Sequence, residues 1–163
     1  MNAALPGNIR FDIHGLAHAI ANCNASDALR CQFSPQRWDI LAGYMQPFAL
    51  GSGQVLIEQG ANDRTIYFIE SGTLSVHYED EKARVRMALV GPGTVIGEGS
   101  FFSHQARSAT VQASGPCKLW SLTPIRFLEL SNRQSSLALE LTMAMGGVMA
   151  KRLYNRPKRV AVT

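Results

Sequence analysis

Residues 97–111 read GEGSFFSHQARSATV and carry the most informative chemistry of this 163-residue chain. The segment holds one carboxylate, Glu98, and one guanidinium, Arg107, separated by two phenylalanines and a polar turn. Glycine at positions 97 and 99 lets another group approach the backbone closely, because glycine has no side chain. A planar cation, a single acid and an open backbone together are typical of a site for a phosphate and a neighbouring hydroxyl.

The alternation of residues after Arg107 predicts that its side chain points into the protein. Ala109 and Val111 share its face of the expected strand, whereas Ser108 takes the other face. A buried guanidinium without a partner is costly, so Arg107 needs an anion, either an internal carboxylate or a ligand phosphate. The simplest internal alternative is an ion pair between Arg107 and Glu98 across a hairpin.

The residues from Gly97 to Ser100 are expected to leave a strand and enter a single helical turn. Free backbone N–H groups at such a turn attract an anion, and the Glu98 carboxylate can accept a hydrogen bond from a hydroxyl next to it. Serine hydroxyls add neutral donors. We therefore predict a ligand site, without catalytic residues, at Gly97, Glu98, Gly99, Ser100, Arg107 and Ser108.

The segments around this motif predict a mainly β fold. Short alternating stretches, separated by turns rich in Gly and Pro, indicate an antiparallel sandwich or barrel with one face in solvent. In two of them, Leu74 and Val76 share one face of their strand, and Val85, Met87 and Leu89 share one face of the next. The expected strands are 55–58, 65–70, 73–78, 84–90, 94–96, 108–113 and 117–122.

Helices are expected on both sides of the β region, from amphipathic spacing or from a capping residue followed by proline. They are predicted within 1–33, from 35 to near Pro47, from 124 to 130 and from 135 to 154. Pro157 is expected to end the last helix. The apolar stripe of that helix is wide enough for burial on two sides, against the barrel and against a second copy of the chain through residues 137–154.

Composition and charge bound the remaining possibilities. The chain is 46% hydrophobic and 17% charged, without an apolar run of about 20 residues. Its first residues do not show the basic region followed by an apolar core that is typical of a secretory leader, so we expect a cytoplasmic protein without a transmembrane segment. Residues 151–163 carry five basic residues and no acidic one, whereas residues 1–150 carry 11 basic and 12 acidic ones. The positive charge is therefore a property of the chain end, either a solvated helix terminus or a non-specific contact for nucleic acid or membrane.

Metal and enzymatic chemistry have little support in the sequence. His14 and His18 can share a helix face, but no third metal ligand accompanies them. A small β-barrel enzyme would need clustered metal ligands on its strands, whereas His77 and His104 each stand alone. The three cysteines form neither a disulfide framework nor a metal-binding pair. We expect no metal, no cofactor and no enzymatic activity.

The motif resembles the phosphate-binding cassette of the cyclic-nucleotide-binding domain family. The matching residues are Gly97-Glu98 with Ser100-Phe101, followed by Arg107-Ser108-Ala109-Thr110-Val111, and further matches such as Gly91-Pro92-Gly93 extend the resemblance over about residues 34–155. The resemblance implies a β-roll of the jelly-roll, double-stranded β-helix type with a long C-terminal dimerisation helix. It also implies that Glu98 binds a ribose 2′-hydroxyl, and that Arg107, Ser108 and the backbone of residues 97–100 bind the cyclic phosphate.

The function implied is that of a stand-alone sensor, which binds cAMP or cGMP as a homodimer and signals to an unknown downstream protein by moving its C-terminal helices. The expected units are a helical or partly disordered segment 1–33, a β-roll 34–132, a helix 133–156 and a basic tail 157–163. Because the chain stops at Thr163, we expect no helix-turn-helix for DNA.

The sequence departs from the family pattern at Gly99, where an aliphatic residue is usual, at Ala106, where proline is frequent, and at Arg156-Pro157, where polar contacts to the base are expected. Another cyclic nucleotide or a cyclic dinucleotide thus stays open as the ligand. A further alternative is an interaction domain that keeps the fold without binding nucleotide, which predicts that Arg107 is already paired internally.

Overall fold

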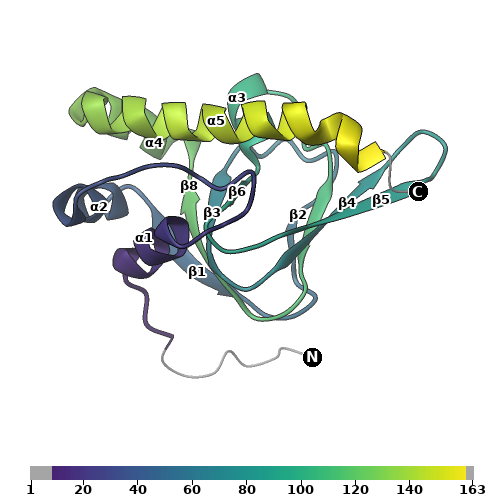
Figure 1. Ribbon diagram of the computed structural model, residues 1–163, viewed down its shortest axis with the longest axis horizontal. Helices are drawn as coiled ribbons and strands as arrows, with labels where there is room; N and C mark the ends of the chain where they lie inside the picture. Colours follow the sequence, from purple (N-terminus) through teal and green to yellow (C-terminus); the bar gives the residue numbers. More distant parts are fainter. Residues whose placement is uncertain (1–8, 161–163) are drawn as a thin grey trace.

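A computed structural model describes residues 9–160, which form two four-stranded antiparallel sheets with helices around them (Figure 1). One sheet has the strand order β1-β8-β3-β6 and the other β2-β7-β4-β5. The prediction of an antiparallel β-roll with flanking helices is confirmed. The strands are β1 Gln46–Leu50, β2 Val55–Ile57, β3 Ile66–Ser71, β4 Leu74–Glu79, β5 Val85–Val90, β6 Val95–Ile96, β7 Thr110–Ala113 and β8 Cys117–Leu122.

Helices α2 and α4 begin at the caps that the sequence predicts, and α1 begins at a cap, Asp12, that was not predicted. The side chains of Asp12, Ser34 and Thr123 each accept a hydrogen bond from a backbone N–H of the first turn, and proline follows the cap in two of the three cases. The helices are α1 Ile13–Ala21, α2 Pro35–Ala42, α3 Glu98–Ser103, α4 Pro124–Arg133 and α5 Ser135–Val160. None of them, within residues 9–160, has the length and hydropathy needed to cross a membrane.

The core has two parts. A large cluster joins the helices to the sheet that contains β3 and β8, and a smaller one fills the space between the two sheets. Helix α5 crosses the end of the β-roll on the side of α3 and β6 (Figure 1), and it buries Leu137, Leu141, Met145 and Val148 in the large cluster, each at most 2% exposed. The periodic burial of one face of α5 fixes this helix next to α3 and therefore next to the Gly97–Val111 motif.

Two predicted boundaries near prolines are wrong. Helix α2 ends at Ala42 instead of near Pro47, and Pro47 lies in β1, a strand that the sequence analysis missed. Strand β1 stands at the edge of its sheet, where proline is tolerated because one side of the strand needs no backbone donor. Pro157 likewise does not end α5, which continues to Val160 at the cost of the one hydrogen bond that proline cannot donate.

Strand β5 shows which face of the second sheet looks inward. Its residues Val85, Met87 and Leu89 are more than 60% exposed, whereas Ala88 and Val90 on the opposite face line a cavity. The sequence predicted that β5 alternates, but it did not predict which face points inward, because the larger apolar side chains lie on the exposed face. The small inward residues leave space inside the roll at the site described next.

Candidate functional site

Gly97 shapes the entry into α3. It is the residue that precedes the helix, and its φ of 89° lies in the left-handed region that favours glycine. A Cβ atom at this position would lie 2.6 Å from Nη1 of Arg107 and 2.8 Å from the carbonyl oxygen of Thr65. Glycine is therefore required here by the close approach of Arg107, in addition to any approach of a ligand.

Arg107 is buried, as its parity in the sequence predicted, with 4% of its surface exposed. Its Nη1 donates a hydrogen bond to the carbonyl of Gly97 at 3.0 Å, and its Nη2 donates to the carbonyl of Thr65 at 2.6 Å and to the carboxylate of Asp63. Its Nε, also buried, has no hydrogen-bond partner among the described residues. The guanidinium is thus oriented by protein groups but retains an unused donor.

Asp63 is the internal anion of Arg107. The backbone N–H and the hydroxyl of Thr65 donate to its Oδ1 at 3.0 and 2.8 Å, and Arg107 occupies its Oδ2. Partial burial alone would raise the pKa of Asp63, but the hydrogen bonds from Arg107 and Thr65 outweigh this and lower it. The sequence did not single out Asp63, because nothing in the local pattern links it to Arg107.

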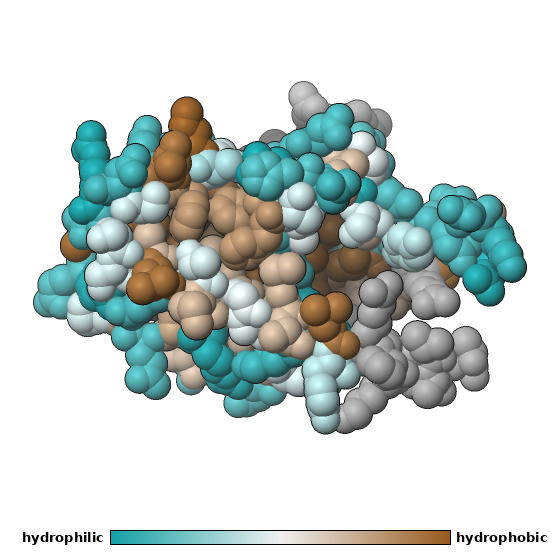
Figure 2. Space-filling view, turned by 90° about the horizontal axis from the view of Figure 1, so that it is seen from above, coloured by the Kyte–Doolittle hydropathy of each residue, from teal (hydrophilic) through white to brown (hydrophobic). Residues whose placement is uncertain are grey.

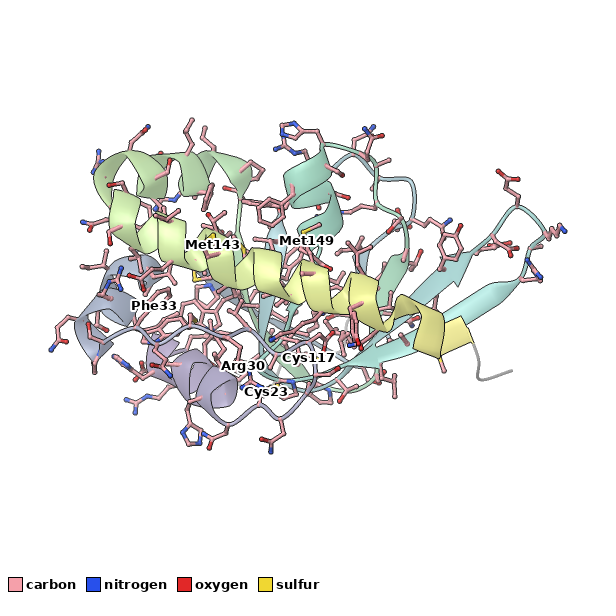
Figure 3. The ribbon with its side chains drawn as sticks, turned by 45° about the horizontal axis from the view of Figure 1, so that its top comes forward. Cys23, Arg30, Phe33, Cys117, Met143 and Met149 are labelled. Atoms are coloured by element: carbon pink, nitrogen blue, oxygen red, sulfur yellow. The ribbon has the colours of Figure 1, made fainter. Side chains whose placement is uncertain are left out.

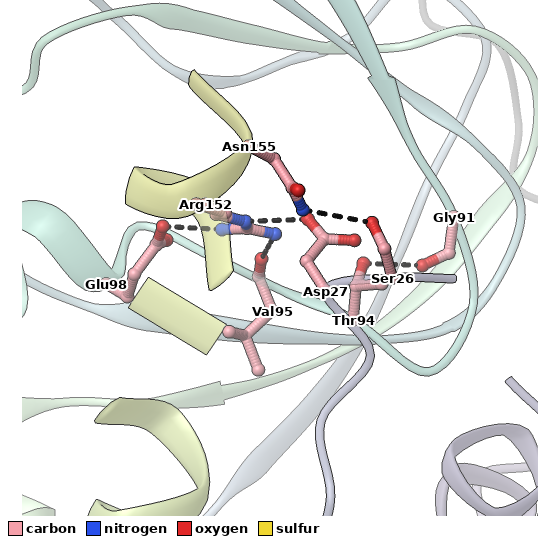
Figure 4. A network of polar contacts seen from close by, with 8 residues as sticks. All are labelled: Ser26, Asp27, Gly91, Thr94, Val95, Glu98, Arg152 and Asn155. Atoms are coloured by element: carbon pink, nitrogen blue, oxygen red, sulfur yellow. Dashed lines mark hydrogen bonds and ion pairs between the residues drawn. The ribbon is translucent and has the colours of Figure 1, made fainter. Parts of the chain in front are cut away.

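Glu98 has a different partner from the one expected. The alternative that Glu98 pairs with Arg107 is wrong, because Glu98 forms its ion pair with Arg152, which reaches the motif from α5 (Figure 4). Arg152 also donates to Asp27 and to the carbonyl of Val95, both at 2.8 Å. Burial alone would lower the pKa of Arg152, but the carboxylates of Glu98 and Asp27 outweigh this and raise it.

The sequence analysis counted Arg152 among the basic residues of the chain end and missed it as a site residue. A signal was available, because Arg152 follows Val148 by four residues and so continues the buried stripe of α5. An arginine on an apolar stripe needs an anion for the same reason as Arg107. Both cations of the site, Arg107 and Arg152, are thus arginines on an otherwise apolar face.

The six predicted site residues converge on one cavity of about 210 Å³. Apart from them and Arg152, the wall is apolar and comes from both sheets. The lining residues are Ile57, Val76, Ala88, Val90, Ile96, Gly97, Glu98, Gly99, Ser100, Arg107, Ser108, Ala109, Val111 and Arg152. A pocket with largely apolar walls and three charged side chains, two of them arginines, suits a ligand that combines an apolar surface with an anionic group.

A larger cavity of about 870 Å³ lies between α1, α2 and the segment that joins them. Its lining contains a single arginine, Arg30, which is exposed and donates to the carbonyl of Cys23. Figure 3 shows Arg30 and Phe33 on this segment, in the neighbourhood of α5. Because no buried charge points to a ligand there, the smaller cavity with Arg107 is the better candidate site. No group of three or more metal-ligating side chains occurs within residues 9–160.

Comparisons with known proteins agree with this geometry. The model of the cyclic nucleotide-binding domain family matches residues 48–134, which is more than half of the chain. A domain of this family from Methylobacillus flagellatus has a known structure that superposes with a TM-score of 0.80 at 21% identity, covering 91% of this chain and 82% of the other. The chain therefore belongs to the cyclic nucleotide-binding domain family.

The chain is similar to both bacterial and eukaryotic curated relatives. It is 30% identical over 111 residues to the cAMP-activated global transcriptional regulator CRP of Salmonella typhimurium, covering 67% of this chain and 51% of the regulator. It is 38% identical over 64 residues to the cAMP-dependent protein kinase type II regulatory subunit of Drosophila melanogaster, covering 39% of this chain and 17% of that subunit. The chain thus spans about half or less of these relatives.

Proposed function

We propose that the chain is a sensor that binds a cyclic mononucleotide, cAMP or cGMP, in the cavity of Arg107 and Glu98 and signals through α5. The observation that carries the proposal is the buried Arg107, whose Nε has no hydrogen-bond partner among the described residues while its other nitrogens are oriented by Gly97, Thr65 and Asp63. Such a guanidinium suits a phosphate oxygen, and the first backbone N–H groups of α3 add donors beside it. Glu98 supplies the acceptor for a ribose hydroxyl.

The size of the cavity connects binding to α5. At about 210 Å³ it is smaller than the roughly 300–1,000 Å³ of pockets that enclose a drug-sized ligand. Helix α5 contributes Arg152 to the wall, so a bound nucleotide needs this end of α5 to shift while Arg152 keeps its bonds to Glu98 and Asp27. A ligand that favours the shifted position changes the population of helix arrangements by its differential affinity for the two states.

The exposed side of α5 supports the proposed homodimer. Leu139, Met143, Gly146, Ala150 and Leu153 are all exposed and follow one another at spacings of four and three residues, the pattern of a coiled-coil seam. Figure 2 looks onto the side of the molecule that carries α5 and shows apolar side chains gathered on that face. A second copy that pairs along this seam would bury them.

The dimer is tested by light scattering on size-exclusion fractions. Met143→Glu, at a position 69% exposed on the seam, should convert the dimer to a monomer, because like charges would face each other across the interface. Met87→Glu, 66% exposed on β5, is the matched control and should leave the dimer intact. A wild-type protein that is monomeric at all concentrations tested would contradict the proposed dimer along this seam.

Ligand binding is tested by thermal unfolding with cAMP, cGMP and cyclic di-GMP. At 100 times its Kd, a ligand adds about 2.7 kcal/mol to the free energy of unfolding. For a chain of this length, that raises Tm by roughly 5–11 °C. Arg107→Lys keeps the charge but loses the fork and should lose most of the shift, whereas Arg84→Lys in the β4–β5 turn should keep it. If only cyclic di-GMP raises Tm, the ligand is a cyclic dinucleotide and the proposal of a mononucleotide is wrong.

A second candidate function is an interaction domain that binds no nucleotide. The ion pair between Arg107 and Asp63 favours it, because this alternative predicts an internally paired arginine. The charges of the site oppose an incoming phosphate as well. Three carboxylates, on Asp27, Asp63 and Glu98, face two guanidinium groups, on Arg107 and Arg152, so these five side chains carry a net charge of −1. A folded wild-type protein that none of the three nucleotides stabilises would establish this second function over the first.

A further inference from the structure

One guanidinium joins the candidate site to the N-terminal part of the chain. Arg152 bonds at the same time to Glu98 at the start of α3, to the carbonyl of Val95 in β6 and to Asp27 in the segment between α1 and α2 (Figure 4). The contact with Glu98 uses only Oε1. The second carboxylate oxygen, Oε2, has no hydrogen bond to the described residues and can accept one from a ligand.

All three charged side chains are largely removed from water. The exposed fractions of the side chains are 15% for Arg152, 11% for Asp27 and 14% for Glu98. In such surroundings, an arginine that loses one partner is left with an undercompensated charge, and its long side chain adopts other rotamers. The orientation of the guanidinium toward Glu98 therefore depends on Asp27 at its opposite edge.

The segment that carries Asp27 is itself fixed against the β-roll. The N–H of Leu29 donates to the carbonyl of Gly93 at 3.0 Å, and Cys23 packs so closely on Gly93 that a Cβ atom there would lie 2.4 Å from that of Cys23. Asn155 of α5 also donates to Ser26 at 3.4 Å. Asp27 is thus held by the turn that leads into β6, and β6 leads directly into Gly97 and α3.

We infer that Asp27 is a positioning residue of the ligand site, which acts through Arg152 to hold the Glu98 carboxylate where a ribose 2′-hydroxyl can donate to it. The inference rests on the proposed function and adds a residue from the N-terminal segment to the site. Asp27 makes no contact with the ligand itself. Its effect is specific to the hydroxyl, because Glu98 and not Arg107 is the group that it orients.

The test compares a cyclic nucleotide with its 2′-deoxy analogue by isothermal titration calorimetry. The wild type should prefer the ribonucleotide, and Asp27→Asn should reduce this preference by roughly three- to tenfold, the scale of coupling within one ion-pair network. The loss should fall on the ribonucleotide and leave the 2′-deoxy analogue unchanged. Asp39→Asn is the matched control, since Asp39 lies in α2 with a side chain 64% exposed, and it should leave both affinities unchanged.

A second background separates positioning from a structural effect. In Glu98→Gln, Asp27→Asn should no longer change the ratio of the two affinities, because the route through Glu98 is already broken. If Asp27→Asn does not fold, Arg152→Lys takes its place, since a lysine cannot reach all three acceptors at once. If Asp27→Asn leaves the ratio of the two affinities unchanged, the positioning role is wrong, whereas the proposed function still stands. A wild type that binds neither ligand overturns the proposed function and this inference with it.

Discussion

Two glycines in the same motif should respond in opposite ways to alanine. Gly97 has a φ of 89°, and an added Cβ would lie 2.6 Å from Arg107 Nη1 and 2.8 Å from the backbone oxygen of Thr65. At Gly99, two residues along and inside α3, an added Cβ meets nothing within 4 Å. The pair therefore separates a glycine that the tertiary structure requires from one that it does not.

The magnitude for Gly97→Ala has two parts. The left-handed backbone costs alanine about 1–2 kcal/mol. Displacing the buried Arg107 from its hydrogen bond to Gly97 costs about 1–3 kcal/mol more. The sum of about 2–5 kcal/mol lowers Tm by roughly 4–20 °C for a chain of this length. Gly99→Ala should instead be neutral or stabilise by up to about 1 kcal/mol, because alanine is the better helix former.

The assay is urea unfolding followed by tryptophan fluorescence, since Trp38 and Trp120 both lie in the large core cluster. Both variants should have the same m-value as the wild type. The urea midpoint should fall for Gly97→Ala, and it should rise or stay unchanged for Gly99→Ala. A Gly97→Ala protein whose free energy of unfolding lies within about 0.5 kcal/mol of wild type would refute the reasoning. Equal destabilisation by the two variants would refute it as well.

Two further predictions concern protonation. Because the pKa of Asp63 is lowered below its ordinary value of 3.8 in the folded protein, its carboxylate contributes stability above that value, and the contribution is lost as the pH falls through the folded pKa. Asp63→Asn should therefore show a flatter fall in stability below about pH 4 in acid titrations followed by circular dichroism, and an unchanged slope contradicts the pairing. Burial, with Glu140 nearby, raises the pKa of Cys31 to about 12, so iodoacetamide at pH 8 should modify it at least tenfold more slowly in the folded protein than in urea. Fast labelling of Cys31 in the folded state, mapped by peptide mass spectrometry, would contradict the raised pKa of this half-buried thiol.

Local sequence determined much of the fold. The capping residues Ser34 and Thr123 with the prolines after them set the starts of α2 and α4, and alternation located most of the strands. The same alternation, carried back to Arg107, predicted its burial, and the six predicted residues line one cavity. These features follow from the sequence because each depends on neighbours within a few residues along the chain.

Only the tertiary structure decided which charges meet. Asp63 pairs with Arg107, and Arg152 joins Glu98 to Asp27, through contacts that span from 44 to 125 positions of sequence. Local patterns can show that a buried arginine needs an anion, but several carboxylates satisfy that need equally well until packing brings one of them within reach. The packing of α5 and of the N-terminal segment against β6 and α3 makes that choice.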